Sequence, residues 1–283
     1  MILITGATGT SGVPIVKALL DRAERVRAMV RDVAKAATLF GEEVEIARGD
    51  LSDPQSIEAA MEDVDRALLN SSPTPDLVDV QSAFINAAKR SGVKHVVKFS
   101  AMSADSKSDR TIAKLHGQVE ETLRNSGLAW TMLRPPFFMQ NFFAMAGMIK
   151  SGAIYQPAGE GRAAFVDVRD IAAVAAATLS ESGHEGKAYD VTGPHALGYR
   201  DVAQTFTNLT DHPVKYQNIS FEDAKQAMMQ MGLSEWIANA INELSRGLQE
   251  GLFANVTNTV REVGKKEPFT LVQFIQDNID LFR

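Results

Sequence analysis

The sequence predicts an α/β fold, a doubly wound parallel sheet with a smaller, mostly helical lobe at its C-terminal end. Three observations predict it. The chain opens with a short apolar strand, a glycine-rich turn and a helix. Segments typical of strands and helices then alternate as far as Arg134, as in a parallel sheet covered on both faces. After Arg134 the chain becomes rich in Phe and Met, so we expect a first domain over residues 1–134 and a second lobe over residues 135–283, with segments that return to the sheet.

The opening turn carries the strongest signal in the chain. Gly6, Gly9 and Gly12 follow the first strand at a spacing of three, and residues 13–20 read as an amphipathic helix. Glycine permits a tight turn and lets the backbone approach phosphate groups, while the helix N-terminus offers free N–H groups and a positive dipole end. This order predicts a pyrophosphate cradle, and the alternative is a turn that binds no phosphate. The expected contacts are Gly6, Thr8, Gly9, Thr10, Ser11 and Gly12.

The remaining elements of the first domain follow from apolar runs bounded by turn residues. Further strands are expected at residues 25–31, 44–50, 66–71, 94–100 and 129–134, and later at 187–192 and 214–219. Helical segments lie between them, for example at 56–61 and 78–91. Ligands of such sheets bind beyond the carboxyl ends of the strands, so residues at these ends are the candidates for a site.

Composition excludes several classes of function. The net charge of −6 gives no basic excess for binding nucleic acid. The chain has no cysteine, which excludes disulfides, thiolate chemistry and cysteine-ligated metal, and its five histidines lack metal-ligand spacing, so no metal is expected. No apolar run is long enough to span a membrane, and no leader precedes the first strand. We expect a cytoplasmic protein whose partner is a small molecule.

The glycine turn, in the form G-x-x-G-x-x-G, resembles that of the extended and atypical short-chain dehydrogenases/reductases. Later motifs resemble the NmrA-like atypical branch, in which a basic residue precedes Val-Glu, a Ser-Gly pair, an aromatic-Thr strand and Leu-Arg-Pro. Here they read His116, Val119-Glu120, Ser126-Gly127, Trp130-Thr131 and Leu133-Arg134-Pro135, and continue at Phe138, Gln140, Asn141, in the run from Phe165 to Ala172 and at Pro268-Phe269. The resemblance implies a Rossmann-like fold that binds a nicotinamide dinucleotide.

The end of the second strand distinguishes the two nicotinamide cofactors. An acidic residue there binds the ribose 2′-hydroxyl of NAD, whereas Arg accepts the 2′-phosphate of NADP. The strand ends with Arg31, and Lys35 follows one helical turn later. We therefore expect NADPH, with NADH less favoured. Two alternatives stay open: Asp32 becomes the ribose ligand if the strand ends one residue later, or Arg31 is a solvated surface charge.

The superfamily resemblance implies further cofactor contacts at the next strand ends. Asp50-Leu51, at the end of the third strand, resembles the pair that binds adenine in the superfamily. A helix N-cap is the alternative role, because Asp53-Pro54 follows closely, and both roles can hold. The residues after the fourth strand lie where the family wraps the cofactor ribose, and those after the sixth strand complete the set. These contacts are Asp50, Leu51, Ser71, Ser72, Pro136 and Phe137.

The chain departs from the superfamily in its catalytic residues. The usual pair is a Tyr and a Lys four residues later, with a Ser at the end of the fifth strand. Ser100 has the place of that Ser, but Ile112 stands for the Tyr and His116 for the Lys. Because isoleucine cannot move a proton, a standard alcohol dehydrogenase is not expected. His116 is open to three roles: a ribose or substrate ligand, a weak general acid, or a structural residue.

Reductases of this branch that lack the pair pass hydride directly to electron-poor conjugated molecules, a step that depends on proximity and exclusion of water. The resemblance implies an NADPH-dependent reductase of an azo dye, quinone or triphenylmethane dye, without flavin or metal. Candidate substrate contacts are Phe138, Asn141, Met145 and Tyr155. The Phe- and Met-rich stretch also suits plain core packing.

A second class of function is also consistent with the missing pair. The same branch includes regulators that bind the dinucleotide, perform no catalysis and report redox state to a protein partner. The complete glycine turn and the large apolar lobe favour the enzyme.

Overall fold

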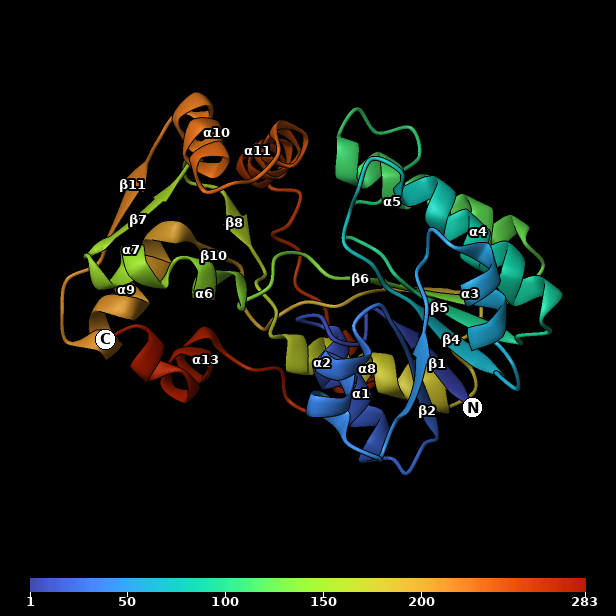
Figure 1. Ribbon diagram of the computed structural model, residues 1–283. Helices are drawn as coiled ribbons and strands as arrows, with labels where there is room; N and C mark the ends of the chain where they lie inside the picture. The colour runs from blue at the N-terminus through green and yellow to red at the C-terminus, as the bar shows by residue number, and fades with distance from the viewer.

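A seven-stranded parallel sheet, with strand order β3-β2-β1-β4-β5-β6-β9, forms the centre of the larger lobe in the computed structural model, which describes residues 1–283 (Figure 1). Its strands are β1 (Ile2–Thr5), β2 (Val26–Val30), β3 (Glu45–Arg48), β4 (Arg66–Leu69), β5 (His95–Phe99), β6 (Ala129–Arg134) and β9 (Lys187–Asp190). The strand order reverses between β1 and β4, which defines the switch point where such sheets bind ligands. The predicted doubly wound parallel sheet is confirmed.

Helices cover both faces of this sheet (Figure 1). One face carries α1 (Gly12–Leu20), α2 (Val33–Phe40) and α8 (Val168–Ser180), and the other α3 (Pro54–Ala60), α4 (Leu77–Arg90) and α5 (Thr111–Asn125). Successive strand residues alternate between the two faces. Ile2 and Ile4 pack in the core under α1, and Leu3 packs in the core under α4.

The smaller lobe is mostly helical and has its own aromatic core. It comprises α6 (Asn141–Ala144), α7 (Ala146–Lys150), β7 (Ala153–Gln156), β8 (Arg162–Ala163), β10 (Leu197–Gly198), α9 (Tyr199–Thr210), β11 (Lys215–Asn218), α10 (Phe221–Gln230), α11 (Glu235–Gln249) and α13 (Leu271–Asp277). Strands β7 and β11 pair in parallel, and β8 and β10 pair antiparallel. Phe142 is fully buried at the centre, with its ring 5.4 Å from that of Phe165 and 5.8 Å from that of Phe206.

The chain returns to the larger lobe after it has entered the smaller one. Helix α8 packs along α1, β9 pairs with β6 at the edge of the sheet, and α12 (Thr259–Glu262) packs on α8. The buried carboxylate of Asp170 in α8 pairs with Lys266 and accepts a hydrogen bond from the Phe269 N–H at 2.8 Å. These contacts join the C-terminal segment to the larger lobe. No helix has the length and apolar character needed to span a membrane.

Candidate functional site

The three glycines of the opening turn differ in what surrounds them. Gly6 has a φ of +63°, and a Cβ there would lie 2.7 Å from the Asn70 carbonyl oxygen. A Cβ on Gly12 would lie 2.1 Å from the Gly6 oxygen, so backbone packing requires glycine at both positions. A Cβ on Gly9 would meet only the Gly6 oxygen, at 3.2 Å, and otherwise open space. Packing therefore constrains position 9 less than positions 6 and 12, through one tight backbone contact, whereas a group that approaches the backbone would require glycine there.

The turn is fastened to the strand across the switch point. The Thr5 hydroxyl donates a hydrogen bond to the Asn70 carbonyl at 2.8 Å, and the Asn70 amide donates to the Ser11 hydroxyl at 3.2 Å. Both threonine and asparagine are buried. Ser11 is thus a packing contact that fixes the start of α1 relative to β4.

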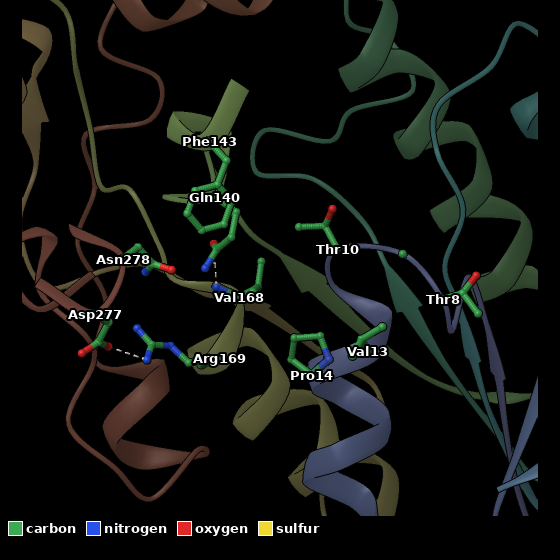
Figure 2. Close-up of a pocket in the computed structure, with 11 residues that line it drawn as sticks. Thr8, Thr10, Val13, Pro14, Gln140, Phe143, Val168, Arg169, Asp277 and Asn278 are labelled. Carbon is green, nitrogen blue, oxygen red and sulfur yellow. Dashed lines mark hydrogen bonds and ion pairs between the residues drawn. The ribbon is translucent and has the colours of Figure 1, made fainter. Parts of the chain in front are cut away.

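A cavity of about 520 Å³ opens at the turn, between the two lobes (Figure 2). The N-termini of α1 and α8 both meet it, and the end of α13 closes its far side. The N-terminus of α1 has no side-chain cap and suits an anion, whereas the first N–H groups of α8 already bond to Gln140 and Asp167. Its lining residues are Thr8, Gly9, Thr10, Val13, Pro14, Gln140, Phe143, Val168, Arg169, Asp277 and Asn278.

The wall opposite the glycine turn is a polar network around α8. Arg169 donates to Asp277 of α13 at 2.7 Å and to Asp167 at 2.7 Å, and its guanidinium lies 3.6 Å from the Phe269 ring centre. Hydrogen bonding to Asp167, and then to Asp277, raises the pKa of Arg169. Gln140 accepts from the Val168 N–H at 3.1 Å, which joins the segment after β6 to the start of α8 (Figure 2). The network holds the two lobes together beside the cavity.

The structure places the residues expected to choose the cofactor at the end of β2. Arg31 is exposed and forms no ion pair, and Lys35 is exposed on α2. Asp32 caps α2 by accepting the Lys35 N–H at 2.9 Å, so its carboxylate already has a structural partner. Hydrogen bonds from Ser52, with a smaller contribution from the charge of Arg31, hold the pKa of Asp50 below its usual value. Arg31 and Asp50 therefore lie at the same edge of the sheet.

The other residues predicted to contact the cofactor follow the carboxyl ends of β3, β4 and β6. The side chain of Asp50 accepts from the Ser52 N–H at 2.9 Å, and it is Asp53 that caps the next helix, α3. Ser71 accepts a hydrogen bond at 2.8 Å from the fully buried Gln81, whose side-chain oxygen has no partner. Leu51 packs against the core under α3 and α4, Ser72 is exposed, and Pro136 and Phe137 follow β6.

Ser100 and Glu120 form a buried cluster behind this edge. The Ser100 hydroxyl donates to the Glu120 carboxylate at 2.6 Å, which also accepts from Arg134 at 2.9 Å and from Arg124 at 2.7 Å. The Glu120 side chain is only 1% exposed. The hydroxyl proton of Ser100 is therefore already used in a hydrogen bond to Glu120 and is not available to a substrate.

His116 has a partner that the sequence interpretation missed. Its Nδ1 lies 3.0 Å from the Nζ of Lys98, a fully buried residue of β5, while Ile112 is buried on the same helix. Burial lowers the pKa of Lys98 to about 7. Both faces of the central strands are covered, so a lysine inside the apolar run at residues 96–99 must be buried. That signal was available in the sequence.

The predicted substrate residues have mixed surroundings. Phe138 packs against the core of the larger lobe, and Met145 against the core of the smaller lobe. Asn141 is exposed at the start of α6, and Tyr155 is exposed in β7. None of the four lines the cavity, to which the same stretch instead contributes Gln140 and Phe143.

A glycine turn with an open central glycine, at the switch point of a doubly wound sheet, defines a dinucleotide-binding protein of the Rossmann-like class. The chain belongs to the NmrA-like family, whose profile matches residues 1–270. It is 40% identical to the NAD(P)H azoreductase of Xenophilus azovorans over 283 residues, which cover 100% of this chain and 99% of the relative.

Two solved structures share the fold over nearly the whole chain. The NADPH-dependent quinone oxidoreductase of Escherichia coli, complexed with NADPH, matches with a TM-score of 0.91 and 30% identity, over 99% of this chain and 100% of its own. The Citrobacter sp. triphenylmethane reductase complexed with NADP(H) matches with a TM-score of 0.88 and 27% identity, over 98% and 99% of the two chains.

Proposed function

We propose that this protein is an NADPH-dependent reductase that transfers hydride to a conjugated, electron-poor acceptor, namely an azo dye, a quinone or a triphenylmethane dye. The observation that carries the proposal is the open backbone at Gly9, which faces the cavity at the start of α1 and is less constrained by packing than Gly6 or Gly12. The names of the relatives, an azoreductase, a quinone oxidoreductase and a triphenylmethane reductase, support the choice of acceptors.

Residues of the cavity and of the neighbouring strand ends suit a dinucleotide. Thr8, Gly9 and Thr10 would hold the pyrophosphate at the N-terminus of α1, where N–H groups are free. Arg31 would pair with the 2′-phosphate, and Ser71 lies at the strand end beside the switch point. The bound nicotinamide supplies the hydride. The structure contains no cluster of three or more acidic or histidine side chains placed to hold a metal ion.

The protein would hold the acceptor close to the nicotinamide and keep water away from the two. With Ile112 buried and Ser100 bound to Glu120, neither residue offers a proton to substrate. Phe137, after β6, packs edge-on against Phe253 with ring centres 5.1 Å apart, so it supplies an apolar surface beside the strand ends. Hydride transfer to a conjugated acceptor needs a close, dry approach and no acid in the same step.

Purified protein should oxidise NADPH steadily when a quinone or azo dye is added, as followed by NADPH absorbance. Simple secondary alcohols and ketones should react poorly, because the Tyr and Lys that serve them are absent. Tight NADPH binding without turnover of any azo, quinone or triphenylmethane acceptor would contradict the reductase and favour the redox-sensing regulator.

Arg31→Ala should weaken NADPH binding by about 1–3 kcal/mol, the range for a charged hydrogen bond, and leave NADH binding nearly unchanged. Fluorescence titration of both cofactors measures this. Arg25→Ala is the matched control, since Arg25 is also exposed but precedes β2 at its opposite end. Equal affinity of the wild-type protein for NADPH and NADH would remove Arg31 from the site.

His116→Ala should lower turnover with a good acceptor by less than roughly 100-fold, the minimum expected for a principal general acid. The reason is that the hydride step itself needs no proton, so losing a proton donor affects only the later protonation of the product. The measurement is kcat across pH, with NADPH affinity determined separately. A fall of several orders of magnitude with cofactor affinity intact would make His116 the essential acid of the hydride step.

A further inference from the structure

Lys98 and His116 form a buried pair at the carboxyl end of β5. Lys98 is fully buried and His116 is 6% exposed. The Lys98 Nζ lies 3.0 Å from His116 Nδ1 and donates to the Phe99 carbonyl at 2.8 Å. The residues beside Lys98 on the flanking strands, Leu69 and Met132, are apolar. Burying an amine among apolar strands costs free energy, and packing alone would be served by a methionine.

The pair dictates which nitrogen of His116 carries the proton. An ammonium group has donors and no acceptor, so a protonated Lys98 forces Nδ1 to accept and leaves the proton on Nε2. The Nε2 atom has no hydrogen-bond partner in the protein, yet it is not sealed off as the unpartnered Nδ1 of His95 is. His116 therefore presents a free N–H donor on the side away from Lys98.

Burial and the nearby charges set how strongly Lys98 and His116 hold a proton. Burial lowers the pKa of Lys98 to about 7, against a smaller opposing effect of Glu120 on α5. Glu120 is itself paired with Arg134 on β6 and Arg124 on α5. Burial and the charge of Lys98 hold the pKa of His116 well below its usual value, so the imidazole stays neutral. A neutral imidazole beside a weakly basic amine can pass a proton in one direction and be reloaded from the other.

We propose that Lys98 is a positioning residue that keeps the proton of His116 on Nε2 and reloads it, so that the pair supplies the proton taken up by a reduced acceptor. The acceptor first receives hydride and becomes an oxygen or nitrogen anion. The Nε2–H bond then breaks as its proton moves to that anion, and Nδ1 takes a proton from Lys98. A water proton next binds Nε2 while Nδ1 returns its proton to Lys98, which restores both the ammonium and the Nε2–H tautomer.

This proposal rests on the proposed function and divides its acceptors into two classes. A quinone or azo compound needs one proton after hydride transfer, because hydride leaves it as an anion. A cationic triphenylmethane dye needs none, because hydride addition to a carbocation gives a neutral product. Loss of the pair should therefore lower kcat with quinones and azo compounds and leave kcat with cationic dyes unchanged.

The first test compares kcat for a quinone and for a cationic triphenylmethane dye between pH 6 and 8. With the quinone, wild-type kcat should fall above about pH 7, and Lys98→Met should lower kcat by roughly 10-fold at pH 6 and remove that fall. KM for NADPH and all rates with the dye should stay unchanged. Lys94→Met, at an exposed lysine just before β5, is the matched control. Equal losses with both acceptors, or no loss with the quinone, would overturn the proposal.

The second test needs neither acceptor nor cofactor. Long-range ¹H–¹⁵N spectra of protein labelled at its five histidines report the tautomer of each ring, and His116→Gln assigns the His116 signals. At pH 6 the wild-type ring should carry its proton on Nε2 alone, and Lys98→Met should lose that single tautomer. An unchanged Nε2–H tautomer in Lys98→Met contradicts the inference. The expected spectra without turnover of any acceptor would instead contradict the proposed function.

Stability offers an independent check on the buried amine. Folding lowers the pKa of Lys98 from its ordinary value of about 10.4 to about 7. Between these values the unfolded chain holds one more proton than the folded chain, so stability should rise with pH across this window. Thermal unfolding should show this rise in the wild type and not in Lys98→Met. Should Lys98→Met fail to fold, His116→Gln must still slow the quinone and spare the dye, or the proposal fails.

Discussion

Gly9→Val should abolish NADPH binding while leaving the protein folded. A valine side chain would occupy the open space above the backbone where the pyrophosphate must come, yet its Cβ meets only the Gly6 oxygen at 3.2 Å. Loss of two or three charge-assisted hydrogen bonds, each worth about 1.5–3 kcal/mol, weakens binding by roughly 100-fold or more. Isothermal calorimetry with NADPH, together with a thermal unfolding curve, measures both parts.

Gly147→Val serves as the matched control for this change. Gly147 is an exposed glycine of α7, and a Cβ there would have no atom within 4 Å, so valine fits without touching the turn. NADPH should bind this variant as it binds the wild type. Tight binding by a folded Gly9→Val protein would mean that the dinucleotide lies elsewhere.

Glu120→Gln should destabilise the protein by about 3–5 kcal/mol, as expected when one partner of a buried ion pair is removed. The carboxylate is 1% exposed and holds Ser100, Arg124 and Arg134 together, so an amide leaves the positive charge of Arg134 with only the weaker attraction of Asp190. Urea unfolding measures the difference. Glu58→Gln is the control, because Glu58 and Arg90 are both about half exposed and such pairs contribute at most about 1 kcal/mol.

The effect of Glu120→Gln should depend on pH. Burial alone would raise the pKa of Glu120, but hydrogen bonds from Arg134 and Ser100 outweigh it and hold the pKa below its ordinary value. The stabilisation is then complete above the ordinary pKa and is lost as pH falls through the lowered one. The gap between wild type and Glu120→Gln should therefore close in acid. A gap that stays constant would show that the charge of Glu120 does not carry the effect.

Most strands of the large sheet could be predicted because they are short runs of mainly apolar residues between turn residues, whereas the edge strands β3 and β9 are more polar. The predicted strand at residues 94–100 appears as β5 (His95–Phe99), and that at 187–192 as β9 (Lys187–Asp190). Strands β8 and β10, with two residues each, have no room for a periodic pattern and were not expected. Their pairing depends on the fold of the smaller lobe, which local sequence does not report.

The candidate site likewise has one part that local sequence predicts and another that depends on the tertiary fold. The glycine turn is local, so its spacing identified it directly. The opposite wall depends on Arg169 meeting Asp277 of α13, two residues far apart in the chain that no motif connects. Likewise, the spacing of the superfamily pointed to His116, and the burial of Lys98 could be read from its apolar strand, but the contact between the two side chains appears only in three dimensions.

The position of α8 in the chain has a consequence for how the protein is made. Helix α1 ends at Leu20, but the helix that covers its apolar residues, Ile15 and Val16 among them, begins only at Val168. A nascent chain leaving the ribosome must therefore carry an uncovered apolar surface until Ser180 has emerged. Contacts between distant segments slow folding, and exposed apolar surface favours aggregation meanwhile. Fragments that end at Arg134 should bind chaperones and collect in inclusion bodies, whereas the full chain should not.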